Sequence, residues 1–547
     1  MSDVTIESIR LAFERFPLDG VLFALNRACR DWQGGTFPRQ GGLLKDLAPR
    51  NPAFMWFAAE AARHAIAWSP QRSSESRISI RSPEPTQAEL IDLLSMSVYA
   101  QTDLRLARVP EQLSRLRTDP LLDIVSRLWY AQCLVEKRSP FRVGQALLTY
   151  KHAPRRRADR DPRFPLRTYE ETLRQVLGCD LDSFLLALMQ IAGISHGENP
   201  CVNMARTLPP EGSCDENLLT HAITQHLRRP SSAAVIAALS ATPQTLLACM
   251  QGDLLHADPY AILDAPNPLL RFPLVSPFRD RVDRVIAPVP HLLLEWLYEP
   301  LFGLLYDARR AAFSKIHLSQ LFEEYVGLLS DRCAPDQLPW IHESRLKSAY
   351  RGRVVDWARQ FTDAVVLIDA KRCFLSNQRR YRSAPGDWDQ THETWSKGAT
   401  QCAAFWDCAT RGMVPALSAS ADKPCIAVVV AQWESELRGL NWHTRETISE
   451  HLTTQGAPSG FQCLVLSLDR FEQLMSTWSG TGEADWLPRK LLEVAAGKPV
   501  EILNALEARA TGPLWNLLED LVGRLAEAVR RSGDDHAVGG NHECGCP

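Results

Sequence analysis

The sequence predicts an α/β protein in which a large, mainly helical N-terminal region precedes a C-terminal mixed sheet flanked by helices. Residues 1–264 repeatedly carry apolar residues at three- and four-residue spacing, as in "AELIDLLSMSVYAQ" and "SFLLALMQIAGI", a pattern typical of amphipathic helices. After residue 315, short β-branched runs alternate with helical patterns, which indicates a sheet covered by helices. Between these regions, residues 265–314 are rich in proline and predict a β-hairpin and helix connector.

The overall composition is typical of a soluble protein with several domains. The chain has 547 residues, a hydrophobic fraction of 45% and a formal net charge of -3, so it has no global attraction to nucleic acid. Its 14 cysteines are scattered and no signal peptide is visible, which favours reduced thiols in a cytoplasmic protein. The most apolar run, 291–306, is short and interrupted by Glu295, Glu299 and Pro300, so we expect no membrane association.

The C-terminal half divides into successive predicted elements. Residues 317–332 have one apolar face and predict a helix, and 392–409 predict another. The runs 352–361 and 364–372 flank a short turn and predict an antiparallel hairpin. Further predicted strands begin at residues 424 and 461. We therefore place a sheet domain at 315–475, C-terminal helices at 476–530 and a disordered tail at 531–547.

A charged break interrupts the helical region at residues 152–167, "HAPRRRADRDPRFPLR". Its arginines and prolines predict a loop. Most charge runs of this kind are solvated. The alternative interpretation is a loop that contacts phosphate groups.

The candidate chemistry lies at the end of the predicted hairpin. A strand has a period of two residues, so Asp369 and Lys371 point to the same side. Pairing of the two strands can bring Asp356 beside Asp369, and two carboxylates make a site suited to Mg²⁺. Lys371 would stabilise developing negative charge. Glu323 or Glu324, on the preceding helix, would complete the metal shell or accept a proton.

In order and spacing, these residues resemble the PD-(D/E)XK nuclease superfamily, which has the restriction-endonuclease-like fold. The similarity covers about residues 315–470 and extends to the nuclease domains of type IV restriction enzymes and bacterial anti-phage proteins. It implies cleavage of nucleic acid with Mg²⁺ or Mn²⁺. Two departures are Val355, where the pattern has proline, and an aspartate at 369, where glutamate is more frequent.

The same resemblance implies roles for residues on two helices. "LFEEYVGLL" is similar to the helix that supplies the superfamily's glutamate, and its position favours Glu323 over Glu324. "KGATQCAAFW" is similar to the helix after the superfamily's lysine, where Lys397 or Gln401 would face the site. Both helices flank the predicted hairpin in the expected order.

A basic segment follows the predicted site directly. Arg372, Arg379, Arg380 and Arg382 surround Tyr381. Basic residues interleaved with an aromatic suit a phosphate backbone and a stacked base. A solvated loop is the equal alternative. Together with Lys397, these arginines are the predicted nucleic-acid contacts.

The function predicted from these observations is a metal-dependent nuclease, acting on DNA as a bacterial anti-phage effector. One alternative is an RNA or tRNA nuclease of the same fold that causes growth arrest. Another, of a different class, is a non-cutting nucleic-acid or protein binding module. The helical N-terminal region would act as a sensor or regulator. A phage-derived protein is the trigger that we consider, and assembly of the protein into an oligomer is a further option. His542, Cys544 and Cys546 in the tail lack a second paired cluster, so we do not predict a zinc site there.

Overall fold

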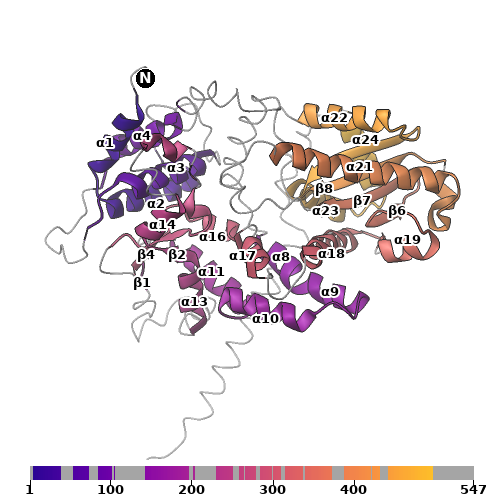
Figure 1. The fold of residues 1–547 in the computed structure, drawn as a ribbon, viewed down its shortest axis with the longest axis horizontal. Coiled ribbons are helices and arrows are strands. Elements are labelled where there is room, and N and C mark those ends of the chain that lie inside the picture. Colours follow the sequence, from indigo (N-terminus) through magenta and orange to yellow (C-terminus); the bar gives the residue numbers. More distant parts are fainter. Residues whose placement is uncertain are drawn as a thin grey trace, which may run out of the picture. The chain divides into compact units, whose positions relative to one another are not determined.

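The computed structural model describes two compact units, each built from separate stretches of the chain (Figure 1). The first unit contains Met1–Val143, Glu170–Ala308 and Leu518–Pro547, and the second contains Gly144–Tyr169 and Arg309–Leu517. Residues 144–169 lie within the predicted N-terminal region but belong to the second unit. The structure describes residues 4–37, 53–72, 84–100, 104, 142–195, 201–203, 230–250, 258–263, 265, 267–278, 284–297, 300–308, 315–336, 339–371, 387–420, 422–431 and 441–496.

The first unit is mainly helical, as the apolar spacing predicted. Its helices are α1 (Ile6–Glu14), α2 (Leu18–Gly34), α3 (Ala53–Trp68), α4 (Gln87–Tyr99), α11 (Leu181–Ser195), α13 (Pro230–Leu239), α14 (Pro243–Cys249), α16 (Leu292–Glu295) and α17 (Pro300–Ala308). Two 3₁₀ turns, Pro259–Leu263 and Pro268–Leu270, lie between them. Thr5 with Ser8, and Thr86 with Glu89, form capping boxes. These boxes bind the free backbone N–H groups at the starts of α1 and α4.

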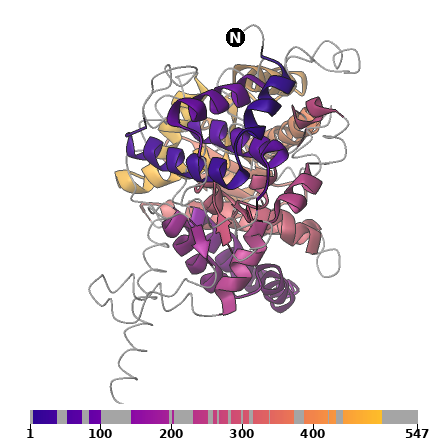
Figure 2. The same cartoon turned by 90° about the vertical axis from the view of Figure 1, so that its left-hand side faces the viewer.

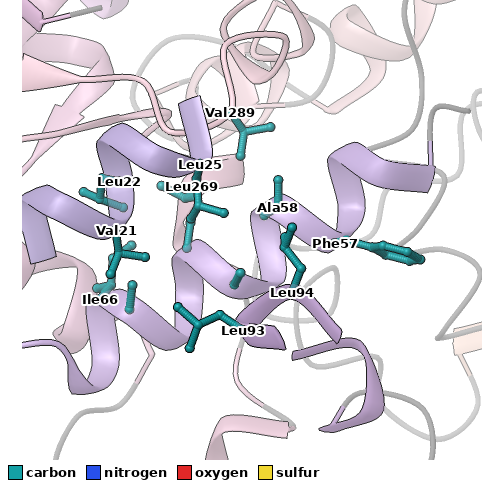
Figure 3. Packing of buried hydrophobic residues seen from close by; sticks show 14 of the residues in the cluster. Val21, Leu22, Leu25, Phe57, Ala58, Ile66, Leu93, Leu94, Leu269 and Val289 are labelled. Carbon is teal, nitrogen blue, oxygen red and sulfur yellow. The ribbon is translucent and has the colours of Figure 1, made fainter. Parts of the chain in front are cut away.

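The core of this unit lies between α2, α3 and α4. Figure 3 shows Leu22 and Leu25 of α2, Ala58 of α3 and Leu94 of α4 among the packed apolar side chains. Figure 2 shows these indigo and violet helices facing the viewer. Asn26, fully buried on α2, donates hydrogen bonds to backbone carbonyls of residues 195 and 287. Burial of many apolar side chains supplies the main stabilisation of this helical group.

A small four-stranded sheet completes the first unit. Its strands are β1 (Cys201–Asn203), β2 (Ser240–Ala241), β3 (Leu274–Val275) and β4 (Arg284–Ile286), in the order β1-β4-β3-β2. β3 and β4 pair antiparallel inside the proline-rich segment for which the sequence predicts a hairpin. β1 and β2 have three and two residues. Strands this short have no measurable alternation, so the sequence did not predict them.

The second unit contains a five-stranded mixed sheet and confirms the predicted α/β class. Its strands are β5 (Ile341–His342), β6 (Trp357–Gln360), β7 (Val365–Lys371), β8 (Cys425–Ala431) and β9 (Phe461–Ser467), in sequence order across the sheet. β5, β6 and β7 pair antiparallel, whereas β7, β8 and β9 are parallel. The hairpin predicted from 352–361 and 364–372 is therefore present as β6 and β7.

Helices cover this sheet. They are α18 (Lys315–Cys333), α19 (Glu343–Ala349), α21 (Asp387–Thr410), α22 (Asn441–Thr454), α23 (Leu468–Thr481) and α24 (Trp486–Ala495). The segment 144–169 adds α9 (Ala153–Arg160) and a π-helical turn, Leu148–His152, while α8 (Arg142–Leu147) and α10 (Leu166–Leu177) cross its boundaries. α21 lies along β7 and β8, which are buried over almost their whole length (Figure 1). Burial on both faces explains why these strands are continuous apolar runs rather than alternating ones.

Within the described ranges, one helical stretch has the length and apolar composition that could cross a membrane. It is Leu166–Gly193, and 53% of its most apolar window is buried inside the protein. Core helices of soluble proteins meet the same two criteria. The apolar run at 291–306 forms the short helices α16 and α17 instead.

Candidate active site

Asp369 and Lys371 lie together at the end of β7. Their side chains form an ion pair, with 2.6 Å between Lys371 Nζ and Asp369 Oδ2. Asp369 is 0% exposed, whereas the Lys371 side chain is 21% exposed. The buried strand thus carries a carboxylate inside the protein, and its last residue brings an ammonium group to the edge of the solvent.

Asp356 lies beside this pair, at the point where β6 and β7 separate. The last paired positions of the hairpin are Trp357 and Ile368, so the next positions in the same register are Asp356 and Asp369. The backbone ladder does not continue there. Instead, Asp356 Oδ2 accepts a hydrogen bond of 2.7 Å from the amide of Ala370. The side chain therefore replaces a backbone acceptor, and two acids meet at the opening between the strands.

Burial sets the protonation of these acids. It raises the pKa of Asp356 well above its usual range, and the negative charges of Asp369 and Glu323 raise it further. Burial also raises the pKa of Asp369, although the ammonium group of Lys371 opposes the shift. Asp369 Oδ1 is buried and has no permanent donor among the residues that the structure describes, and the neighbouring Asp356 carboxyl can donate to Asp369 when it is protonated. An unsatisfied buried carboxylate oxygen is costly unless a cation or donor binds it.

Lys371 stays charged in this environment. Burial alone would lower its pKa, but the neighbouring carboxylates of Asp369 and Asp356 outweigh burial and raise it. Lys371 is therefore an ammonium group at neutral pH. It can attract and donate to an anion, but it cannot serve as a general base.

The structure distinguishes the two glutamates of α18. Glu323 is half-buried, and its pKa is raised to about 7 by burial and then by the charges of Glu343 and Asp369. Glu324 is only 1% exposed, and its carboxylate lies 3.0 Å from Arg160 Nη1 of α9. Burial raises the pKa of Glu324 while the arginines of α9 oppose the shift. Glu323 thus interacts electrostatically with the charged residues at the end of β7, whereas Glu324 forms ion pairs with the arginines of α9.

The arginine-rich segment is mostly helical, so the prediction of a loop at 152–167 is wrong except for residues 161–165. Pro154 is the second residue of α9, which continues directly from the π-helical turn Leu148–His152. Arg156 and Arg160 stack over Trp357 at 5.0 and 4.9 Å and pair with Glu324. These two arginines bind the protein's own acid and aromatic ring, rather than lying free in solvent as a charge run usually does.

Gly327 allows α18 to pack closely against the sheet. A methyl group at this position would lie 1.9 Å from Cζ2 of the buried Trp357, so only glycine permits the helix to approach β6. Gly327 is one helical turn after Glu323, and residues four apart lie on the same face. Trp357 directly follows Asp356. The close approach therefore fixes Glu323 near the beginning of β6.

Gly398 of α21 packs against the acid–lysine pair, a contact that the sequence did not predict. A methyl group added to Gly398 would lie 3.0 Å from Asp369 Oδ2 and 3.2 Å from Lys371 Cε. By contrast, the Lys397 side chain is 70% exposed and pairs with Glu393 at 2.7 Å. Glycine inside a helix is unfavourable by about 1 kcal/mol relative to alanine. A glycine within a predicted helix is therefore a sequence signal that another part of the chain packs closely against it.

Gln401 lies one turn after Lys397 and Gly398 on α21. Its Nε2 donates a hydrogen bond of 2.5 Å to the backbone carbonyl of Val354, two residues before Asp356. The amide of Gln401 thus holds the chain that leads into β6. The structure thus assigns the Gln401 side chain a contact with the backbone that precedes Asp356.

Glu343 is a second acid that sequence reasoning missed. It begins α19 immediately after β5, and its backbone N–H donates 2.8 Å to the carbonyl of Asp356. Its charge contributes to the raised pKa values of Glu323 and Asp369. β5 has only two residues, so no alternation marked the strand that places this acid.

Several predicted residues lie outside the described part of the chain. They are Arg372, Arg379, Arg380 and Arg382 after β7, and His542, Cys544 and Cys546 in the tail. Their predicted roles remain predictions.

The donor chemistry of the site suits a hard divalent cation, although the structure does not gather a finished cage. Among the described residues, no three His, Cys, Asp or Glu side chains are arranged so that they could hold a metal ion. Lys371 forms an ion pair with one carboxylate oxygen of Asp369. The backbone amide of Ala370 donates a hydrogen bond to one carboxylate oxygen of Asp356. The buried Asp369 Oδ1, which has no permanent donor among the described residues, and the raised pKa of Asp356 are what a cation would relieve.

Comparisons with known proteins add no assignment. No protein-family model matches the chain, and neither a search of curated proteins nor a search of solved structures gave a match. Proposals about function therefore depend on the residues and their geometry.

Proposed function

We propose that the second unit is a metal-dependent nuclease that hydrolyses phosphodiester bonds. One observation carries the proposal: the end of β7 joins a fully buried Asp369, an ion-paired Lys371 and Asp356 at the opening of the hairpin. The buried Asp369 Oδ1 has no permanent donor among the described residues, and a bound cation is one explanation for a buried carboxylate oxygen of this kind. The resemblance of these residues to the PD-(D/E)XK superfamily in order and spacing supports the same chemistry.

Asp356, Asp369 and Glu323 are the residues that would hold Mg²⁺ or Mn²⁺. When bound, the ion would polarise the phosphodiester and lower the pKa of an attacking water. Glu323, with a pKa of about 7 in the free protein, can exchange a proton near neutral pH. Glu323 would therefore either complete the metal shell or accept a proton, while Asp356 and Asp369 supply the anionic ligands.

Lys371 would act on the phosphate rather than on the metal. Its raised pKa keeps it protonated, and its partial exposure gives a phosphate oxygen access to the ammonium group. A fixed positive charge beside the reacting phosphate stabilises negative charge that develops in the transition state. Removing such a donor typically lowers the rate by about 10²–10³-fold.

We propose DNA as the substrate and anti-phage defence in the cytoplasm as the setting, both on the strength of the resemblance. RNA or tRNA cleavage uses the same phosphodiester chemistry, so the substrate has to be measured directly. The first unit would then regulate or trigger the second.

The test is a cleavage assay with the full chain. Plasmid DNA, single-stranded DNA and total tRNA are incubated with Mg²⁺, Mn²⁺ or EDTA, using the wild type, Asp369→Asn and Lys371→Met. We expect metal-dependent cleavage of one substrate class, loss of at least about 100-fold in both variants, and unchanged circular dichroism. Asp363→Asn is a matched control because Asp363 is an exposed acid at the turn of the same hairpin.

Two outcomes would contradict the proposal. Metal-dependent cleavage that survives both substitutions would place the active site elsewhere. Binding of nucleic acid with no cleavage under any condition, and equally by wild type and variants, would favour the binding-module alternative.

A further inference from the structure

The arginines of α9 share one buried acid, Glu324. Arg160 Nη1 lies 3.0 Å from Glu324 Oε2, and Arg156 Nε lies 3.5 Å from the same oxygen. Arg156 has a second acid, Asp331. Arg157 Nη1 lies 3.8 Å from Glu324 Oε1, which is too far for a hydrogen bond. One carboxylate cannot accept from every N–H group of several guanidinium groups, so Arg157 is left with the weakest contact.

Arg157 finds no better partner at the end of its helix. Its Nη2 makes one long hydrogen bond of 3.5 Å to Asp161 Oδ2, and Arg163 lies closer to Asp161, at 3.2 Å. The Nε of Arg157 is buried and has no hydrogen-bond partner among the described residues. The side chain is 15% exposed, so a ligand from solvent can approach it. Arg157 is therefore a cation with donors that the protein's own acids do not satisfy.

This arginine lies beside the proposed active site. Glu324, which Arg157 faces, directly follows Glu323 on α18. The charge of Arg157 also opposes the rise in the pKa of Glu323. A substrate bound at the end of β7 therefore has an incompletely paired cation next to it, on the side where α9 packs.

The surface around Arg157 is positive. The ring of His342 packs on Trp357 at 4.6 Å, and Arg156 and Arg160 stack on the same indole ring. Burial lowers the pKa of His342 to about 3, and the charges of Arg160, Arg156 and Arg157 act in the same direction. His342 is thus neutral at neutral pH. A place that disfavours one more cation favours an anion.

We propose that Arg157 binds a backbone phosphate of the nucleic acid, on the α9 side of the proposed active site. This inference rests on the proposed function, because it identifies how the same substrate is held. The planar fork of a guanidinium group matches two oxygens of a phosphate, so a phosphate supplies the acceptors that Arg157 lacks. Lys371 remains the contact for the reacting phosphate, and Arg157 takes a neighbouring one.

The experiment measures binding of labelled duplex DNA, single-stranded DNA and tRNA to the full chain by fluorescence anisotropy. EDTA prevents cleavage, and the salt concentration is varied from about 50 to 200 mM. We expect Arg157→Met to weaken binding about tenfold at the lowest salt. The slope of log K against log salt concentration should fall by about one. Arg157→Lys keeps the charge and should restore the slope but only part of the affinity, because an ammonium group lacks the planar fork.

Two matched controls separate position from charge. Arg155 is exposed on α9 and two residues from Arg157, so it points to the other side of the helix. Arg155→Met should bind like the wild type, and a loss of slope equal to that of Arg157→Met would overturn the inference. Asp161→Asn removes a competing acid from Arg157 and should tighten binding about two- to threefold, whereas Asp159→Asn, at an exposed acid of α9, should not. If Arg157→Met does not fold, this second pair decides: equal affinities would overturn the inference.

The outcomes also separate this inference from the proposed function. Wild-type affinity and slope in Arg157→Met would overturn the inference, while metal-dependent cleavage that requires Asp369 would leave the proposed function intact. Binding that depends on Arg157, with no cleavage under any condition, would support the inference and overturn the proposed function. Absence of binding by the wild type to all three nucleic acids would overturn the inference.

Discussion

Substitution of Gly398 by alanine tests whether α21 holds the acid–lysine pair in position. The added methyl group would lie 3.0 Å from Asp369 Oδ2, 3.2 Å from Lys371 Cε and 3.2 Å from Val429 Cγ1. Separations this short require the neighbours to move by a few tenths of an ångström. Two of the three neighbours belong to the proposed active site, so the movement falls on Asp369 and Lys371.

The expected effect on stability is small because two contributions oppose each other. Alanine in place of glycine stabilises a helix interior by about 1 kcal/mol, whereas overpacking a core destabilises by about 1–3 kcal/mol. The net change is therefore between about zero and 2 kcal/mol of destabilisation. Activity responds more strongly, since a misplacement of about 1 Å can lower a rate by about 100-fold. A shift of a few tenths scales to a loss of about four- to tenfold.

The assay compares Gly398→Ala with Gly480→Ala in metal-dependent cleavage and in urea unfolding. Gly480 lies in α23, and a methyl group there meets no atom within 4 Å. The control should gain at most about 1 kcal/mol and cleave like the wild type. If Gly398→Ala also cleaves like the wild type and gains stability as the control does, then α21 does not constrain Asp369 and Lys371, and the reasoning is refuted.

Three further substitutions test the packing and charge around the site. Gly327→Ala places a methyl group 1.9 Å from Trp357. We expect the free energy of unfolding, measured in urea, to fall by about 3 kcal/mol or more. Wild-type stability of this variant would contradict the close packing of α18 on Trp357. Glu324→Gln removes the buried carboxylate that pairs with the arginines of α9. We expect the urea midpoint to show a destabilisation of about 3 kcal/mol. An unchanged midpoint would mean that this ion pairing does not stabilise the fold. The folded state raises the pKa of Glu323 from 4.5 to about 7, so it binds this proton more tightly than the unfolded chain does. Stability in EDTA should therefore fall as pH rises from about 4.5 to about 7, and Glu323→Gln should fall less over that range.

The hairpin and its polar end were predictable because strand pairing is local and periodic. β6 and β7 are separated by a short turn, and the uninterrupted apolar run from Ala364 to Ile368 marked a buried strand. The period of two then brought Asp369 and Lys371 to one side, where they form the 2.6 Å ion pair. Information of this kind lies within about twenty residues of sequence and needs no knowledge of the rest of the fold.

The rest of the site depends on contacts that have no local signature. Glu343 follows a strand of two residues, which is too short for any alternation. Gly398 is one glycine in a long helix, and only the structure shows that Asp369 and Lys371 lie against it. Glu323 and Glu324 are adjacent and both lie off the apolar stripe of their helix. What separates them is the approach of α9, from a segment more than 150 residues earlier.

The segment 144–169 therefore belongs to the architecture of the proposed nuclease. Gln145 donates to Glu472 of α23, which also accepts from Tyr325 of α18, and all three side chains are buried. Farther along the segment, Arg160 of α9 binds Glu324. The segment 144–169, which the sequence order assigns to another region, thus holds helix α18 at the adjacent residues Glu324 and Tyr325. Because Glu323 directly precedes these two residues on α18, the segment positions an acid of the site without contributing one.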